Sequence, residues 1–240
     1  CKIAGNSWFQ FKQFRVIQEK AAMKIGTDAV LLGAWTDVSE ARYILDVGTG
    51  TGILSLMLAQ RSDAQITAIE LEKNAAEEAA ENVRNSPWPN QVFVENISFQ
   101  EFAERSVCKY DRIVSNPPFF SNNLKSASKN LAMARHNDLL SLSDLAEGAE
   151  KLLSENGKLS LVFPVESAQK FTELAAKKNL FPIRQTEVSH RKASKTNRFL
   201  LEFSRKQLPP KKDYLSIQTE NGHDFSAEFK KLTRDFYLRF

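Results

Sequence analysis

The tetrapeptide Asn116-Pro117-Pro118-Phe119 places an amide side chain, free backbone carbonyls and an aromatic ring directly after the apolar run Tyr110 to Ser115. Proline has a fixed φ and no backbone donor, so a strand over that run must end here. In an open α/β sheet, the turn at the carboxyl end of a strand faces the ligand crevice. These groups suit a flat ring that carries an amino group. The Asn116 side-chain oxygen and the Pro117 carbonyl would accept its two N–H hydrogens, and Phe119 would stack on its face.

A glycine-rich motif, Asp46-Val47-Gly48-Thr49-Gly50-Thr51-Gly52, stands between an earlier apolar run and a helical pattern. Its glycines let the backbone approach a ligand where a side chain would obstruct. The dinucleotide pattern GxGxxG would need glycine at Ile53, whereas the tighter GxGxG spacing favours a nucleoside without phosphates. Glu70 ends the next apolar run, where a carboxylate can accept the hydroxyls of a ribose. Together these features predict a ribose-bearing cofactor, although each alone is also compatible with a plain turn.

Apolar runs alternate with helical patterns from residue 43 onward, which indicates a mostly parallel sheet covered by helices. The expected strands are 43–47, 65–70, 91–95, 110–115, 158–163, 182–190 and 197–205. The expected helices are 27–35, 53–60, 74–85, 143–153 with Ser143 as its cap, and one that ends over 174–179. The last two strands follow one another without a helix, so we expect an antiparallel hairpin at one edge of the sheet.

We expect a single domain in three parts: an amino-terminal flap and helix over 1–36, an α/β core over 37–206 and a carboxyl-terminal extension over 207–240. The flap includes residues 8–18, where aromatic and polar residues alternate as in a short hairpin. No apolar run approaches the roughly 18 residues that a membrane span needs. The two cysteines are too few for a disulfide framework or a zinc site. A cytoplasmic monomer without a metal is therefore expected.

Positive charge is concentrated in residues 177–212, which hold eleven Lys or Arg and two Glu, while the chain as a whole carries a net charge of +4. Charge gathered in one stretch favours a polyanion partner, because phosphate contacts are electrostatic and local. Arg191, Lys192 and Lys195 lie in the loop of the expected hairpin and are candidate nucleic-acid contacts. Basic runs are also common as plain solvated surface.

The glycine turn, the acidic strand end and the sheet order resemble those of the class I S-adenosylmethionine-dependent methyltransferases. The resemblance implies a Rossmann-like fold with a seven-stranded sheet, helices on both faces and a last strand inserted antiparallel. It implies that Asp46, Gly48, Thr49, Gly50 and Gly52 surround the methionine end of S-adenosylmethionine and that Glu70 holds the ribose. An acidic residue usually faces the adenine of the cofactor, and the nearest candidate here is Asn96.

The tetrapeptide at 116–119 resembles the (D/N/S)-P-P-(Y/F/W) signature of methyltransferases that act on exocyclic or amide nitrogens. The resemblance assigns catalysis to Asn116, Pro117, Pro118 and Phe119, with Asn116 also beside the cofactor. Phe120 would add a second wall for the base. Arg135 and His136, in the polar segment that follows, would meet a phosphate or the flipped base, or lie on a loop surface.

Nearly the full length of the chain resembles bacterial tRNA methyltransferases that modify the exocyclic amine of adenosine 37 in a valine tRNA. The residues that carry this resemblance are 11–14, 23–35, the two central motifs and 232–238. It places Lys24, Thr27 and Asp28 beside the cofactor, while Thr27 also suits a simple helix cap. A base next to the anticodon is already in a loop, which makes its exposure cheaper than extrusion from a duplex.

Three alternatives stay open at this point. The same tetrapeptide occurs in enzymes that methylate guanine amines of ribosomal RNA. A noncatalytic RNA-binding protein on the same fold is a second alternative, which a lack of cofactor binding would support. A dinucleotide oxidoreductase is disfavoured by the glycine spacing and by the absence of an obvious proton donor at the crevice.

Overall fold

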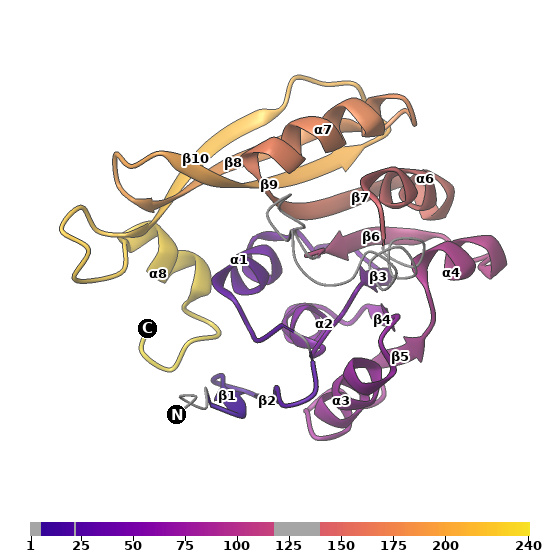
Figure 1. The fold of residues 1–240 in the computed structure, drawn as a ribbon, viewed down its shortest axis with the longest axis horizontal. Coiled ribbons are helices and arrows are strands. Elements are labelled where there is room, and N and C mark those ends of the chain that lie inside the picture. Colours follow the sequence, from indigo (N-terminus) through magenta and orange to yellow (C-terminus); the bar gives the residue numbers. More distant parts are fainter. Residues whose placement is uncertain (1–5, 22, 118–139) are drawn as a thin grey trace, which may run out of the picture.

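The computed structural model describes residues 6–21, 23–117 and 140–240. The strands are β1 (Trp8–Gln10), β2 (Arg15–Ile17), β3 (Tyr43–Val47), β4 (Gln65–Glu70), β5 (Val92–Asn96), β6 (Tyr110–Ser115), β7 (Leu153–Pro164), β8 (Phe181–Arg191), β9 (Thr196–Ser204) and β10 (Lys211–Gln218). The helices are α1 (Thr27–Trp35), α2 (Ile53–Ala59), α3 (Lys73–Arg84), α4 (Phe99–Arg105), α6 (Leu142–Leu152), α7 (Val165–Ala176) and α8 (Ala227–Thr233) (Figure 1). None of the helices in this described part of the chain is long and apolar enough to cross a membrane.

The main sheet has the strand order β10-β8-β9-β7-β6-β3-β4-β5. Strands β7, β6, β3, β4 and β5 pair in parallel, and β9 is antiparallel to both β7 and β8. This confirms the α/β class and the antiparallel hairpin, which consists of β8 and β9. β1 and β2 form the separate amino-terminal hairpin.

The sheet has an eighth strand in addition to the seven that the sequence predicts. β10 lies in the carboxyl-terminal segment and pairs parallel to β8, from Lys211 opposite Arg184 to Gln218 opposite Arg191. It is an edge strand, and only Leu215 and Ser216 in it are buried. An edge strand with so little buried surface has a weak apolar signal, which explains why the sequence pattern did not identify it.

Several boundaries agree with the sequence pattern and a few do not. β3, β4 and β6 have the predicted limits. The expected cap of α6, Ser143, lies inside the helix, because Ser141 forms a capping box with Asp144 in its place. α4 and α8 were not predicted, although serine caps both, Ser98 and Ser226 respectively.

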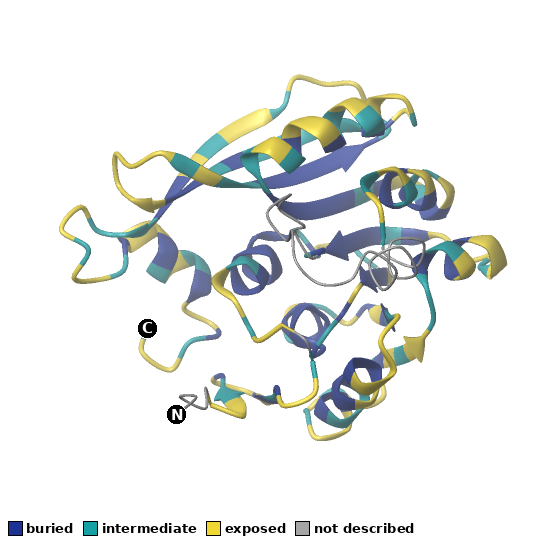
Figure 2. Cartoon of the chain, in the orientation of Figure 1, coloured by how far each residue is buried: buried dark blue, intermediate teal, exposed yellow. Residues whose placement is uncertain are grey.

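The core lies on both faces of the sheet. One apolar cluster packs α1, α2 and α8 against one face, and a second packs α4, α6 and α7 against the other. Along β3, Ile44 belongs to the first cluster, while Leu45 and Val47 belong to the second. Figure 2 shows the central strands mostly buried, and in β3 only the first residue, Tyr43, is exposed, as expected for a parallel sheet that is covered on both sides.

The topology defines where a ligand can bind. From β3 the chain adds β4 and β5 on one side, then returns to add β6 and β7 on the other. The loops that follow β3 and β6 therefore leave the sheet at its switch point, where open α/β sheets have their ligand crevice. Val47 is opposite Ile69 and Ser115 in the register, so the glycine turn, Glu70 and Asn116 emerge at one edge.

Candidate active site

The glycine turn after β3 is held open by main-chain hydrogen bonds. Gly48 and Gly50 have positive φ values of 72° and 57°, a region that favours glycine. The amides of Gly48 and Thr49 both donate to the Ile69 carbonyl at 3.0 Å. A Cβ added at Gly48 or Gly50 would meet no atom within 4 Å, so both glycines face open space. The turn thus presents bare backbone toward a cavity.

Asp46 lies behind this turn and is fully buried. Its Oδ2 accepts hydrogen bonds from Thr49 Oγ1 at 2.6 Å and from Ser55 Oγ at 2.7 Å, which fixes the turn to the start of α2. Its Oδ1 has no hydrogen-bond partner among the described residues. Burial raises the pKa of Asp46 to about 6, because removal from water opposes ionisation more strongly than the hydrogen bonds favour it, and the Glu70 charge adds to the rise.

Glu70 connects the end of β4 to the glycine turn. Its Oε2 accepts from the Gly50 amide at 2.9 Å and its Oε1 from the Glu72 amide at 3.0 Å. A carboxylate has about four lone-pair sites, so each oxygen keeps capacity for a further donor. The Glu70 side chain lines the cavity, which places a fixed acceptor there for two hydroxyl groups.

Asn116 follows β6 directly across the switch point from the glycine turn. The strand ends are joined by Ser115, whose Oγ donates to the Val47 carbonyl at 2.7 Å. Asn116 Oδ1 is buried and has no hydrogen-bond partner within the described part of the chain. A buried acceptor without a partner costs free energy and is unusual in folded proteins, so this atom is a candidate contact for a ligand donor. Pro117 is buried beside it.

Two adjoining hollows meet at these residues. They share Met23, Gly48, Gly50 and Asn116. The larger one extends past Glu70 and Pro117 to the segment 97–100, and the smaller one past Thr49 to Lys24 and the start of α1. Asn116 therefore lies where the two hollows join, with an acceptor carboxylate in one and a lysine in the other.

Six of the predicted cofactor residues line these hollows and the others do not, among them Asp46, which lies behind the glycine turn. Asn96 is exposed, and its amide donates to the Glu70 and Leu71 carbonyls at 2.9 Å, away from the cavity. Thr27 is the exposed first residue of α1 and lines neither hollow. Gly52 packs against Ala79 of α3. Pro118, Phe119, Phe120, Arg135 and His136 lie outside the described residues.

The wall next to Asn96 is a segment that the sequence reasoning did not single out. Ile97, Ser98, Phe99 and Gln100 line the larger hollow, at the junction of β5 and α4. Ser98 Oγ accepts from the Glu101 amide at 3.1 Å as the cap of α4. Serine followed three residues later by glutamate is a helix-start signal, and it would have placed a helix and a loop at this edge.

α3 holds the amino-terminal segment that closes the smaller hollow. Glu78 is 1% exposed, and its carboxylate accepts from the amides of Glu19, Lys20 and Ala21 at 2.6 to 3.0 Å. One turn along, Asn82 bonds both main-chain groups of Ile17 and the Thr51 carbonyl. α3 thus links the flap to the glycine turn. The signal in the sequence is a polar pair among the alanines of the buried helix face.

The described residues contain no group of three or more His, Cys, Asp or Glu side chains that could hold a metal ion. The polar groups at the cavity include main-chain amides, the Glu70 carboxylate and the Asn116 side-chain amide. Such a set suits a nucleoside with hydroxyl and amino groups.

A mostly parallel sheet with a glycine turn at its switch point and an acidic residue at the end of the next strand is typical of α/β enzymes that bind a nucleotide or nucleoside cofactor. Residues 19–199 match the model of the methyltransferase small domain, and the chain belongs to this family. Its fold is also similar to that of an Agrobacterium tumefaciens protein described as a predicted O-methyltransferase. The TM-score is 0.66 at 19% identity, over 87% of this chain and 96% of that one.

Two relatives match over almost their whole length. The chain is 46% identical to a protein from Trichodesmium erythraeum (98% of this chain and 100% of the relative). It is 45% identical to a protein from Flavobacterium psychrophilum (96% of this chain and 99% of the relative). Both are named tRNA1(Val) (adenine(37)-N6)-methyltransferase.

Proposed function

We propose that this protein transfers a methyl group from S-adenosylmethionine to the exocyclic amine of an adenine in tRNA, adenosine 37 of a valine tRNA. The observation that carries the proposal is the buried, unpartnered Oδ1 of Asn116 at the junction of the two hollows. Two full-length relatives named for this reaction favour adenine in tRNA over the alternative of a guanine in ribosomal RNA.

The residues at the cavity fit S-adenosylmethionine. Gly48 and Gly50 leave room for a ligand against bare backbone, and Glu70 offers an oriented carboxylate for the ribose hydroxyls. Ile97, Phe99 and Leu71 give the larger hollow the apolar surface that an adenine ring requires. When bound, the cofactor supplies a methyl group on a positively charged sulfur.

The chain's part in the reaction is to orient the target amine and increase its nucleophilicity. The lone pair of an adenine amine is delocalised into the ring, so the nitrogen is a poor nucleophile. Asn116 Oδ1 and the Pro117 carbonyl accept its two N–H hydrogens and draw electron density back onto the nitrogen as positive charge develops there. These acceptors replace a strong general base. Phe119 and Phe120 would stack on the base in this proposal.

The RNA-binding part of the proposal rests on the hairpin between β8 and β9. β8 runs parallel to β7, so its end at Arg191 lies at the same edge of the sheet as the cavity. Arg191, Lys192 and Lys195 are exposed in this loop. They would contact phosphates that flank the target, together with Arg135 and His136. A cytoplasmic monomer that acts without a metal completes the proposal.

The test is methyl transfer from labelled S-adenosylmethionine to total tRNA that lacks its modifications, with nucleoside analysis of the product. We expect label in N6-methyladenosine, and its position is then mapped to residue 37 of valine tRNA. Ribosomal RNA is tested in parallel, because label in a guanine nucleoside of that RNA would favour the guanine alternative. Label in a guanine nucleoside, or cofactor binding without transfer to any RNA, would contradict the proposal.

A further inference from the structure

A groove in the carboxyl-terminal segment carries positive charge that the proposed reaction does not use. It lies between the end of β10, the turn that follows it, and α8 with the residues after it. We call it the C-terminal groove, and its basic and acidic lining residues are Asp224, Lys230, Lys231, Arg234 and Arg239, next to His223. Four cations therefore line it, against one carboxylate.

Two of these cations have no counter-charge. Lys230 Nζ pairs with Asp224 Oδ2 at 2.5 Å, and Arg234 Nε lies 3.7 Å from Asp235 Oδ1. Lys231 and Arg239 are exposed and form no ion pair within the described residues. The groove thus offers two uncompensated positive charges to an anion.

The positions of the cations are fixed by the core beneath them. Phe225 stacks on Phe229 at 4.9 Å and meets Phe240 edge to face at 5.3 Å. Lys12 Nζ donates to the carbonyls of Arg234 and Phe240 at 2.6 and 2.5 Å. These contacts attach the segment that bears Lys231, Arg234 and Arg239 to the amino-terminal hairpin. The main chain that carries these charges is therefore held in place by the core.

The groove is continuous with the hairpin loop at the cavity edge. Gln218 at the end of β10 is opposite Arg191 at the end of β8. A Cβ added at Gly222 would lie 2.7 to 2.8 Å from the Arg191 guanidinium, so that side chain covers the turn next to His223. Figure 1 shows the hairpin loop and this turn projecting on the same side of the molecule. Basic side chains are therefore present on the hairpin loop, at Lys195 and Arg191, and in the groove beyond the turn that Arg191 covers, at Lys231 and Arg239.

The hairpin loop extends beyond the strand end that carries Asn116. β6 ends at Ser115 opposite Leu161, β7 continues to Pro164 opposite Arg198, and β8 continues from Val188 to Arg191. The tip is thus about six residues beyond the end of β6 at Ser115, or about 20 Å at 3.3 Å per residue. Phosphates along an RNA strand are spaced so that several lie within this span, and a strip of cations suits them.

We propose that the C-terminal groove binds backbone phosphates of the RNA substrate several nucleotides away from the base that is methylated. This inference rests on the proposed function and extends it to a second contact site. Phosphate contacts set register and orientation on the nucleic acid and do not read sequence. The groove would therefore contribute affinity for any tRNA and leave the choice of base to the cavity.

The experiment compares two double variants with the wild-type protein. Lys231→Gln/Arg239→Gln removes the two uncompensated charges, and Lys151→Gln/Lys170→Gln removes two exposed charges from α6 and α7 on the opposite face of the sheet. Binding of unmodified, fluorescently labelled tRNA is measured by anisotropy from low to moderate salt. S-Adenosylmethionine affinity and thermal unfolding report on the site and the fold, and wild-type methyl transfer is assayed in the same preparation.

We expect the groove variant to bind tRNA about tenfold more weakly at low salt and to reduce the log–log salt slope by about 2, or about 1 for each lost contact. The affinity for S-adenosylmethionine should stay at the wild-type value in both variants. The control variant on α6 and α7 should bind tRNA as tightly as the wild-type protein does. Unchanged tRNA binding by the groove variant, with active wild-type protein, would overturn the inference and leave the proposed function intact. An equal loss in both variants would overturn it too, because charge alone would explain the result. Wild-type protein that neither binds nor methylates tRNA would overturn both proposals.

Discussion

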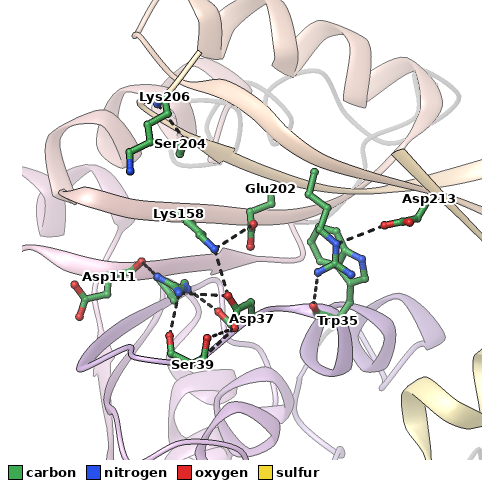
Figure 3. Close-up of polar contacts among 11 residues, drawn as sticks. Trp35, Asp37, Ser39, Asp111, Lys158, Glu202, Ser204, Lys206 and Asp213 are labelled. Atoms are coloured by element: carbon green, nitrogen blue, oxygen red, sulfur yellow. Dashed lines mark hydrogen bonds and ion pairs between the residues drawn. The ribbon is translucent and has the colours of Figure 1, made fainter. Parts of the chain in front are cut away.

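Two polar centres lie at opposite ends of the same strands, and they differ in how far their side chains are satisfied. At the cavity edge, Asn116 Oδ1 and Asp46 Oδ1 are buried without partners among the described residues. At the other edge, Lys158 Nζ lies 3.2 Å from Asp37 Oδ2 and 3.6 Å from Glu202 Oε1. Figure 3 shows Lys158 between the two carboxylates.

Most of the far cluster is paired within the chain, although Glu202 Oε2 is also buried without a hydrogen-bond partner among the described residues. Arg112, 7% exposed, donates to the carbonyls of Asp37, Asp111 and Ser39. Although burial opposes it, hydrogen bonds from Ser39 and Lys158 lower the pKa of Asp37 to about 2. In contrast, the pKa of Asp46 is raised. Most polar groups of the far cluster therefore have partners within the chain, whereas Asn116 and Asp46 each leave one buried acceptor oxygen without a partner at the cavity edge, at a cost to stability.

The largest expected effect is the loss of turnover on substitution of Asn116, the unpartnered acceptor at the cavity edge. Asn116→Ala should lower kcat by about 10²–10³, as loss of one oriented transition-state contact does. S-Adenosylmethionine affinity and stability should change little, because no described residue depends on Oδ1. Asn116→Asp keeps an acceptor oxygen and serves as the matched variant. The measurement is single-turnover methyl transfer to tRNA; an alanine variant as active as the aspartate variant would remove Asn116 from the mechanism.

The far cluster should affect stability and not turnover. Lys158→Met leaves Glu202, whose side chain is 5% exposed, without its cation, and we expect a loss of about 3 kcal/mol in the free energy of unfolding. Lys158→Met/Glu202→Leu should recover part of this loss. Lys178→Met breaks the exposed pair with Glu147 and should cost less than about 1 kcal/mol.

Urea unfolding measures these losses, and methyl transfer per folded molecule should stay at the wild-type value in all three variants. A selective fall in kcat without loss of stability would mean that the far cluster takes part in catalysis. The proposed division of the sheet into two ends would then be wrong.

Glu70 belongs to the cavity edge, but it should act on binding. Glu70→Ala should weaken S-adenosylmethionine binding by about 10- to 100-fold, equivalent to about 1.4–2.7 kcal/mol, because acceptors for the ribose are lost. Glu70→Gln keeps one acceptor oxygen and should lose less. Isothermal titration gives the affinities. An equal loss in both variants would assign the effect to the Gly50 amide, which either substitution affects.

The sequence predicted those parts of the fold and site whose signals are local. The runs at β3, β4 and β6 are buried on both faces, so their limits follow from apolar character alone. The glycines and Asn116 emerge at one edge because parallel strands end together. The cavity wall at Ile97–Gln100 and the binding of the amino-terminal segment by the Glu78 carboxylate depend on which elements pack together. Their residue types, an ordinary serine cap and a helical glutamate, also fit exposed positions.

Contacts between distant segments also explain why the direction of the Asn96 side chain was not predicted. Its place at the end of β5 was predicted, but the direction of its side chain depends on the Glu70 and Leu71 carbonyls, which lie far from it in sequence. β10 was not predicted because an edge strand needs little apolar surface, and pairing with β8 defines it. The periodicity of apolar residues and the spacing of residues within motifs predict main-chain positions well. Hydrogen bonds between distant segments, in contrast, decide where polar side chains point.

The last expected effect concerns the opposite pKa shifts of the two centres. A carboxyl whose pKa rises from 3.8 to about 6 on folding binds its proton more readily in the folded state. Asp46 therefore adds stability as the pH falls from about 6 toward 4 and costs stability above that range, by at most about 3 kcal/mol. Asp37 has the reverse effect, since its lowered pKa adds stability above pH 4 that is lost toward pH 2.

Asp46→Asn isolates this effect through its pH dependence. The variant carries a constant cost if its amide nitrogen replaces the unpartnered Oδ1, and a constant cancels when two pH values are compared. Urea unfolding at pH 7, 5.5 and 4.5 should show the wild-type protein gaining on the variant as the pH falls. Asp37→Asn should show the opposite trend below pH 4. A difference between wild type and Asp46→Asn that is constant across this range would mean that Asp46 ionises normally, and that the cavity edge holds no excess electrostatic cost relative to the far cluster.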